Sequence, residues 1–279
     1  MSITRSNKFW IIIVFCSLLA YDLYWLLNSL VNPYYLSSGD PLLSTFLIAD
    51  YVLPITGEVF RFLGITLALF SAYLVWGPKP KPFSKVKKKA AIALLFEATY
   101  FLLLLPINIL FISDIGLLPI FIGFISQVLL VSPLLIILSI TVWRFKETTK
   151  EEVLKWAGIT AIGYLIGIWI NNVFKWFTTT NVSDGFLLGG INSVNFLNSI
   201  ILLSLSVIFA FTGFYTLSKK EIKRHATRWI AAALITLGLH LVIFIINLVL
   251  ANSLEWVLLT EIWPIVLLGL GLNMLKEEI

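Results

Sequence analysis

The chain has 279 residues, of which 59% are apolar and 13% are charged, and its mean hydropathy is +0.96. Soluble domains carry about 45–50% apolar and about 25% charged residues, so this composition excludes a soluble globular protein and indicates one that lies in a bilayer. The net charge is +5, and the single cysteine, Cys16, excludes an intramolecular disulfide.

Apolar segments recur along the whole chain, each with about 20 residues, the length with which a helix crosses the hydrocarbon core. Uninterrupted runs rich in Leu and Ile predict helices, because the strands of a membrane barrel would alternate apolar and polar residues. The connections are too short for a soluble domain. We therefore expect one all-α domain over residues 1–279, a polytopic membrane protein with eight transmembrane helices in four hairpins. The expected spans are 8–31, 54–76, 90–112, 117–143, 153–174, 190–217, 229–250 and 254–274.

The basic residues predict the orientation of these spans. Lys and Arg gather at the N-terminus, after every second span and at Lys276, most densely in GPKPKPFSKVKKK at 77–89. By the positive-inside rule these connections and both termini face the cytoplasm, and we expect the protein in the plasma membrane. The rule accounts for the basic loop without nucleic acid as a partner, and the alternative for that loop is a site for anionic lipid.

The first span has a second interpretation. Arg5 and Lys8 precede the apolar run FWIIIVFCSLLA, an order that is also typical of a cleaved signal peptide. Apolar residues continue to Val31, which favours a retained transmembrane helix.

Two charges interrupt the second span, where Glu58 and Arg61 lie one helical turn apart in VLPITGEVFRFLG. In a helix that begins near Pro54, Arg61 lies about 10 Å below the outer surface, and Asp22 in the first span reaches a similar depth. An unpaired charge costs at least about 2.5–3.5 kcal/mol at the centre of a bilayer. We therefore expect Asp22, Glu58 and Arg61 to form a buried cluster; the alternative is a local pair whose side chains extend to the headgroups.

Further polar residues occur in the outer halves of the expected spans. Asn192, Asn195 and Asn198 repeat every third residue, so they share one face of a helix. The other candidates for this region are Asn171, Asn172, Lys175, His240, Asn247 and Glu261. Together these residues predict an outward-opening polar cavity for a small solute or ion, with the expected group of Asp22, Glu58 and Arg61 at its base. The alternative is that the amides and charges hydrogen-bond one another between helices.

Aromatic residues and one His recur in the outward-going spans. Tyr100 and Tyr164 each precede an Asn by eight residues, and Tyr21 and His240 each precede one by seven. A fourfold duplication of a hairpin would produce this pattern, and so would chance. Glu97 is expected in a different place, about two turns in from the cytoplasmic face, where lysines of the 85–89 run can reach it.

Motifs of enzymes and metal sites are missing from the sequence. HExxH and CxxC do not occur, and two histidines, His225 and His240, cannot build a three-histidine metal site, so we expect no cofactor and no metal. A nucleotide-binding loop is missing too, so transport would draw on a gradient or a separate subunit. Asn181 begins the sequon NVS on the predicted outer side and is a candidate for glycosylation.

Three functions agree with these observations. The first is movement of a small solute or ion through the polar cavity. The alternative is a non-catalytic anchor or accessory subunit of a larger complex, for example a respiratory one, with other membrane subunits as partners. The third is an intramembrane enzyme that acts on a lipid, with Asp22, Glu58 or Glu261 as acid or base, which no motif supports. A continuous, water-accessible cavity that reaches Arg61 would discriminate between the first two, because an anchor has no need of one.

Overall fold

The computed structural model describes residues 5–31, 52–110, 118–145, 149–179, 197–218, 223–250 and 263–276. These residues are almost entirely helical, and none of them lies in a strand. The α-helices are α1 (Arg5–Val31), α3 (Leu53–Trp76), α4 (Phe83–Leu110), α5 (Leu118–Trp143), α6 (Lys150–Thr179), α8 (Ser204–Ser218), α9 (Lys223–Leu250) and α11 (Trp263–Lys276). A π-helix, η3 (Ser199–Leu203), leads directly into α8.

Within the described residues, five helical stretches are long and apolar enough to cross a bilayer. They are Ile55–Trp76, Ile125–Trp143, Lys150–Val173, Ile200–Leu217 and His225–Ile246, and shorter apolar stretches occur at Lys8–Tyr21 and Pro264–Lys276. Large apolar side chains such as Phe70, Leu129 and Phe211 are exposed on the outside of these helices, a surface that lipid would cover. The expected class, an all-helical multi-pass membrane protein, agrees with these helices, and the count of eight spans stays a prediction.

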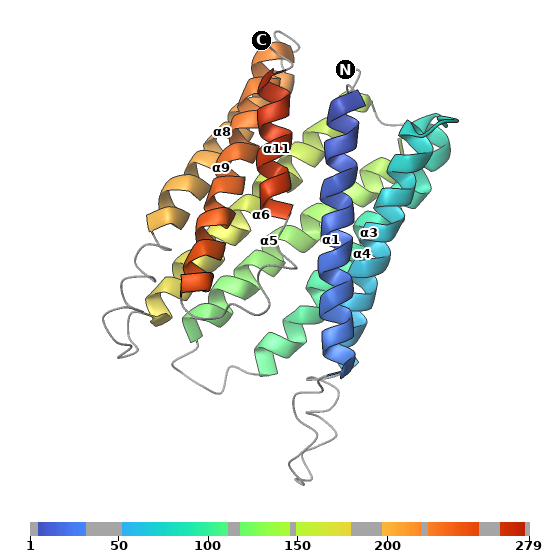
Figure 1. The fold of residues 1–279 in the computed structure, drawn as a ribbon. Coiled ribbons are helices and arrows are strands. Elements are labelled where there is room, and N and C mark those ends of the chain that lie inside the picture. Colours follow the sequence, from blue (N-terminus) through green and yellow to red (C-terminus); the bar gives the residue numbers. More distant parts are fainter. Residues whose placement is uncertain are drawn as a thin grey trace.

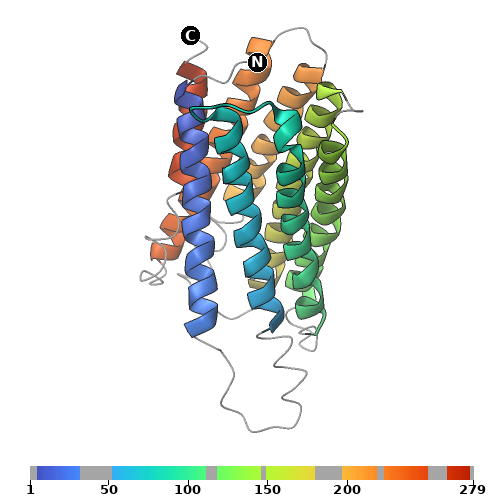
Figure 2. The ribbon, with the colours of Figure 1, turned by 90° about the vertical axis from the view of Figure 1, so that its right-hand side faces the viewer.

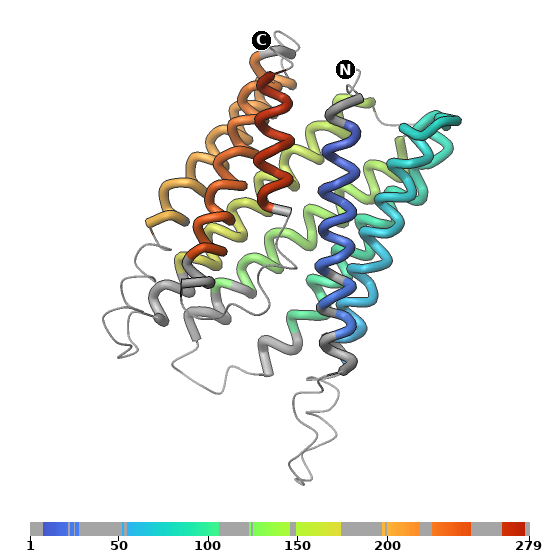
Figure 3. The backbone as a smooth tube through the Cα atoms, in the orientation of Figure 1, coloured from blue at the N-terminus to red at the C-terminus, as the bar shows by residue number. Residues whose placement is uncertain are grey.

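Helices that follow one another in the chain pack side by side (Figure 1, Figure 2). Because α1 also packs against α11, the helices close into a ring in the order α1, α3, α4, α5, α6, α8, α9 and α11. The start of α1, the end of α11 and the connection from α3 to α4 lie at the same end of the ring, as the backbone tube also shows (Figure 3). We call this the basic end, because Lys79, Lys81 and the lysines at the start of α4 lie there.

Small residues bring neighbouring helices close together at several places in the ring, including the contact of α3 with α4 and that of α1 with α11. A Cβ atom at Gly64 of α3 would lie 3.2 Å from the carbonyl oxygen of Ala93 and 3.6 Å from the backbone nitrogen of Glu97, both on α4. At the seam between the first and last helices, a Cβ at Gly269 of α11 would lie 2.7 Å from the ring of Trp10 on α1. A larger side chain at either glycine would push the helices apart.

The helix α4 begins at Phe83, well before the expected start at residue 90, and so includes the lysine run. Lysine favours helices, and its long side chain can cover apolar groups while the ammonium group stays near water. Lys88 Nζ lies 5.4 Å from the ring centroid of Trp143, and Lys89 Nζ lies 5.5 Å from that of Phe70. The helix therefore extends beyond the expected apolar span, and the span itself stays a prediction.

Candidate functional site

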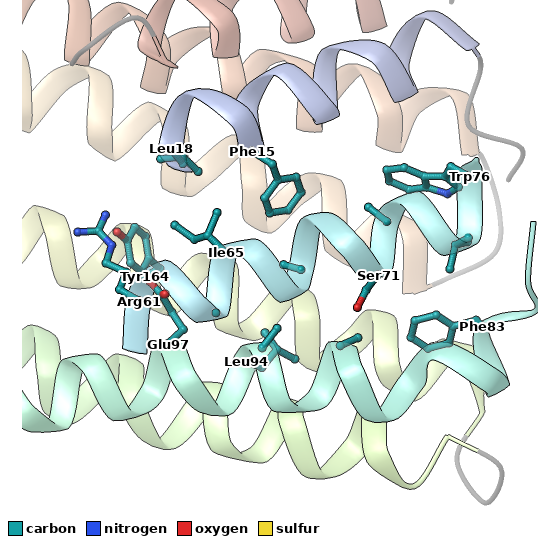
Figure 4. Close-up of a pocket in the computed structure, with 16 residues that line it drawn as sticks. Phe15, Leu18, Arg61, Ile65, Ser71, Trp76, Phe83, Leu94, Glu97 and Tyr164 are labelled. Carbon is teal, nitrogen blue, oxygen red and sulfur yellow. The ribbon is translucent and has the colours of Figure 1, made fainter. Parts of the chain in front are cut away.

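A pocket of about 510 Å³ lies among α1, α3, α4 and α6 (Figure 4). It extends along α3 from Arg61 to Trp76 and along α4 from Glu97 to Phe83, a length of about 22 Å at the helical rise per residue. Most of its lining is apolar. The polar side chains that line it most clearly are those of Arg61, Ser71, Glu97 and Tyr164.

The space exists because small side chains face it. Gly64, Ala68 and Ala72 follow one another at four-residue spacing on α3, so they share one face of the helix, and all three line the pocket. Ala90 and Ala93 line it from α4. Larger side chains at these positions would fill the gap between the helices, as they do in an ordinary close-packed core.

Arg61 lies at the end of the pocket that is farther from the basic end, between two tyrosines. Its Nη1 donates a hydrogen bond of 3.3 Å to the hydroxyl oxygen of Tyr100 on α4. Its Cζ lies 5.0 Å from the ring centroid of Tyr100 and 5.7 Å from that of Tyr21 on α1. A guanidinium group within about 6 Å of an aromatic face is attracted to it, so both rings stabilise the charge of Arg61 inside the bundle.

Two carboxylates and a third tyrosine accompany Arg61. Glu58 lies one turn before Arg61 on α3, and Glu58, Glu97 and Tyr164 all interact electrostatically with Tyr100. Tyr164 lines the pocket from α6, and its ring forms a T-shaped contact with that of Phe101 on α4 at a centroid distance of 6.1 Å. Figure 4 shows Arg61, Glu97 and Tyr164 at one end of the pocket and Trp76 and Phe83 at the other. From here on, the Arg61 cluster means Tyr21, Glu58, Arg61, Glu97, Tyr100 and Tyr164.

The placement of Glu97 differs from the sequence-based expectation, which separated it from Arg61. Glu97 lies about 21 Å from the start of α4 and Arg61 about 22 Å from the end of α3, so both are at one level of the antiparallel pair. The close contact of Gly64 with the backbone of Glu97 holds them there. Glu97 and Arg61 therefore line one pocket instead of lying apart, as the sequence-based expectation had them.

The predicted partner of Arg61 on α1 lies outside the described side chains. The helices α1 and α3 do pack together, and Tyr21, the residue before Asp22, contacts Arg61. The side chain of Asp22 itself is not among those described, so its contact with Arg61 stays a prediction.

The other predicted site residues whose side chains the structure describes do not line this pocket. Asn198 is buried at the start of η3, and its Nδ2 donates a hydrogen bond of 3.0 Å to the backbone oxygen of His240 on α9, which is also buried. This bond agrees with the hydrogen-bonding alternative for that member of the Asn stripe. Asn171 and Asn172 are half-buried on α6. The side chains of Lys175, Asn181, Asn192, Asn195, Asn247 and Glu261 lie outside the described part of the chain.

Sequence reasoning missed the three tyrosines as site residues. It noted that Tyr21, Tyr100 and Tyr164 recur at comparable positions of successive outward-going spans, and that signal could have found them, because equal depth is a condition for contact. It could not show that the three side chains turn towards Arg61, since the rotation of each helix about its own axis follows from packing.

In chemical terms the site is an apolar pocket with a charged end. Among the described residues, no group of three or more His, Cys, Asp or Glu side chains could hold a metal ion. Comparisons with models of known protein families, with curated proteins and with solved structures found no match to this chain. Functional inference therefore depends on the pocket itself.

Proposed function

We propose that the chain is an eight-span membrane protein that binds a small solute in the pocket and moves it across the bilayer. The observation that carries this proposal is that the pocket reaches Arg61. Its volume of about 510 Å³ falls in the range of about 300–1,000 Å³ that is usual for small-molecule sites. A subunit that only anchored a larger complex would gain nothing from a cavity that ends on a half-buried arginine.

The position of Arg61 supports transport as well as binding. The described pocket runs from Arg61 towards the basic end. The polar residues that the sequence predicts on the other side of Arg61 would continue the path to the outer surface. Arg61 would then stand in the middle of a route through the ring, where a transporter binds its solute before releasing it on the opposite side. A gradient or a separate subunit would supply the energy.

A pair of cysteine variants tests access to the pocket. Ser71 and Ser132 are both buried, 5% and 1% exposed, but Ser71 lines the pocket and Ser132 on α5 does not. In a Cys16→Ser background, a small water-soluble methanethiosulfonate reagent should modify Ser71→Cys in membrane vesicles. Ser132→Cys is the matched control and should stay unmodified, because Ser132 is buried and does not line this pocket.

The competing interpretation predicts the opposite result. If Ser71→Cys resists the reagent from both sides of the membrane and the protein copurifies with stable partners, the chain is an accessory subunit. Modification that a candidate solute blocks, at Ser71→Cys alone, would support transport.

A further inference from the structure

The charges at the Arg61 end of the pocket indicate what class of solute the pocket takes, an inference that rests on the proposed function. Among the described side chains of the Arg61 cluster, Arg61 brings one positive charge, and Glu58 and Glu97 bring two negative charges. Lys88 and Lys89 on α4 do not alter this sum, because their ammonium groups lie over Trp143 and Phe70. A contribution from Asp22 would make the sum more negative still.

Arg61 is already engaged by its neighbours. Its guanidinium group donates to the hydroxyl of Tyr100 and lies against the rings of Tyr100 and Tyr21. An anionic solute would have to give up its hydration beside the carboxylates of Glu58 and Glu97, which repel it. A cation at the same place would bring the sum of charges to zero, which is the less costly state in a medium of low dielectric constant.

The rest of the pocket suits the body of an organic cation. Its walls are apolar, and the rings of Phe15, Trp76, Phe83 and Tyr164 line it. Aromatic faces attract organic cations, and apolar walls bury hydrocarbon without breaking hydrogen bonds. A small inorganic ion would leave most of this space unfilled, so the shape favours a larger molecule with a single charge.

We propose that the pocket binds an organic monocation, with its charge beside Glu97 and its apolar body along α3 towards Trp76 and Phe83. Glu97 is then the residue that selects the sign of the charge. Arg61 is then a positioning residue, because its own positive charge lies between Tyr21 and Tyr100 and repels the cationic group.

Tetraphenylphosphonium and tetraphenylborate test this proposal directly, because the two ions have nearly the same shape and opposite charges. Each is offered to the purified full-length protein in detergent by equilibrium dialysis, with a detergent blank subtracted. We expect saturable binding of tetraphenylphosphonium and not of tetraphenylborate. Glu97→Gln should weaken that binding by at least about tenfold, because it removes the charge that faces the cation. Glu152→Gln is the matched control, since Glu152 is exposed at the start of α6.

A second measurement guards against a Glu97→Gln variant that does not fold. In Ser71→Cys with Glu97 intact, tetraphenylphosphonium should protect the thiol from the methanethiosulfonate reagent and tetraphenylborate should not. Preferential binding of tetraphenylborate, or saturable binding of neither ion, would overturn the assignment of a cation. The proposed function is judged separately, because it depends on whether Ser71→Cys is reached by the reagent at all.

Discussion

Arg61 shows how a charged residue is accommodated in a helix that is otherwise apolar. Its planar guanidinium group donates to a phenol oxygen and lies against two aromatic faces, and the carboxylates of Glu58 and Glu97 lie near the same tyrosine. A lysine could not reproduce this arrangement, because its ammonium group is a compact point charge without a flat face. The residue is therefore positioned by shape as well as by charge.

Removal of the Arg61 charge alone should destabilise the protein more than removal of the Arg61 and Glu97 charges together. We expect Arg61→Gln to lower the free energy of unfolding by about 1–3 kcal/mol, because it leaves half-buried carboxylates without a nearby cation. Adding Glu97→Gln should recover part of the loss. Thermal unfolding in detergent measures both, and strictly additive effects of the two substitutions would show that Glu97 and Arg61 do not interact.

A second comparison of single and double variants tests Asp22, the partner of Arg61 that the sequence predicts on α1. Arg61→Ala alone should be more harmful than Asp22→Ala combined with Arg61→Ala, since the single change strands the carboxylate and the double change removes both charges. The measurement is again the unfolding temperature of the purified protein. Equal stability of the single and double variants would place Asp22 outside the Arg61 cluster.

The pair formed by α3 and α4 sets the geometry of the pocket at the scale of single elements. Because the helices are antiparallel and meet closely at Gly64, the level of Arg61 on one is the level of Glu97 on the other. Further along the same face, the small side chains of Ala68 and Ala72 line the pocket and leave its space open. One helix face thus provides both the close approach and the pocket.

Two glycines on α3 make a matched test of this contact. A Cβ at Gly64 would lie 3.2 Å from a backbone oxygen, whereas at Gly57 its nearest neighbour would be 3.5 Å away, in the Tyr100 ring. We expect Gly64→Ala to destabilise the protein by about 1 kcal/mol through crowding. Gly57→Ala should be neutral or stabilising by up to about 1 kcal/mol, because alanine favours helix more than glycine does.

Unfolding of the two alanine variants in parallel separates the effects of crowding and of helix propensity. Equal stability of Gly64→Ala and Gly57→Ala would mean that α3 and α4 are free to move apart at Gly64. In that case the shared level of Arg61 and Glu97 would need another cause.

The π-helix η3 is a second element with local consequences. A π-turn is wider than an α-turn, and such turns occur mostly as short interruptions of α-helices. Here it follows Asn198, whose side chain ties this turn to the backbone of His240 on α9. The change of helical geometry after Asn198 means that a constant spacing of residues does not keep one face through this segment.

The whole molecule is a closed ring in which the first and last helices meet. Trp10 of α1 packs on Gly269 of α11. Each α-helix in the described part of the chain therefore packs against at least two other helices. The pocket lies towards the basic end of this ring. If that end faces the cytoplasm, the pocket is nearer to the inner membrane surface than to the outer one.

Topology can be measured by labelling cysteines from each side of the membrane in a Cys16→Ser background. We expect Ser84→Cys, beside the lysine run, to react with a membrane-impermeant reagent from the cytoplasmic side. Ser183→Cys should react from the outside, because the map of eight spans places Asp40, Asp114, Asp184 and Asn252 there. Labelling of Ser84→Cys from outside would reverse the orientation of the whole map.

The sequence by itself determined the class of the protein and the approximate positions of its helices. Both follow from quantities that do not depend on the neighbours of a residue: the fraction of apolar residues, and the length of apolar run that a bilayer of fixed thickness requires. It also singled out Arg61, because a charge in such a run must be compensated by something. The helix α4 begins at Phe83, before the expected span at residue 90, because a helix can continue beyond its apolar span into the polar headgroup region.

Only the tertiary structure decided which side chains surround Arg61. Contact of Tyr21 and Tyr100 with Arg61 depends on how each helix is rotated about its axis, and small residues such as Gly64 fix that rotation by allowing one close approach. The pocket is likewise a property of several helices together. Gly64, Ala68 and Ala72 are ordinary residues of an apolar helix in the sequence, and they leave a cavity because α1 and α6 present Phe15 and Tyr164 at its edges without filling it.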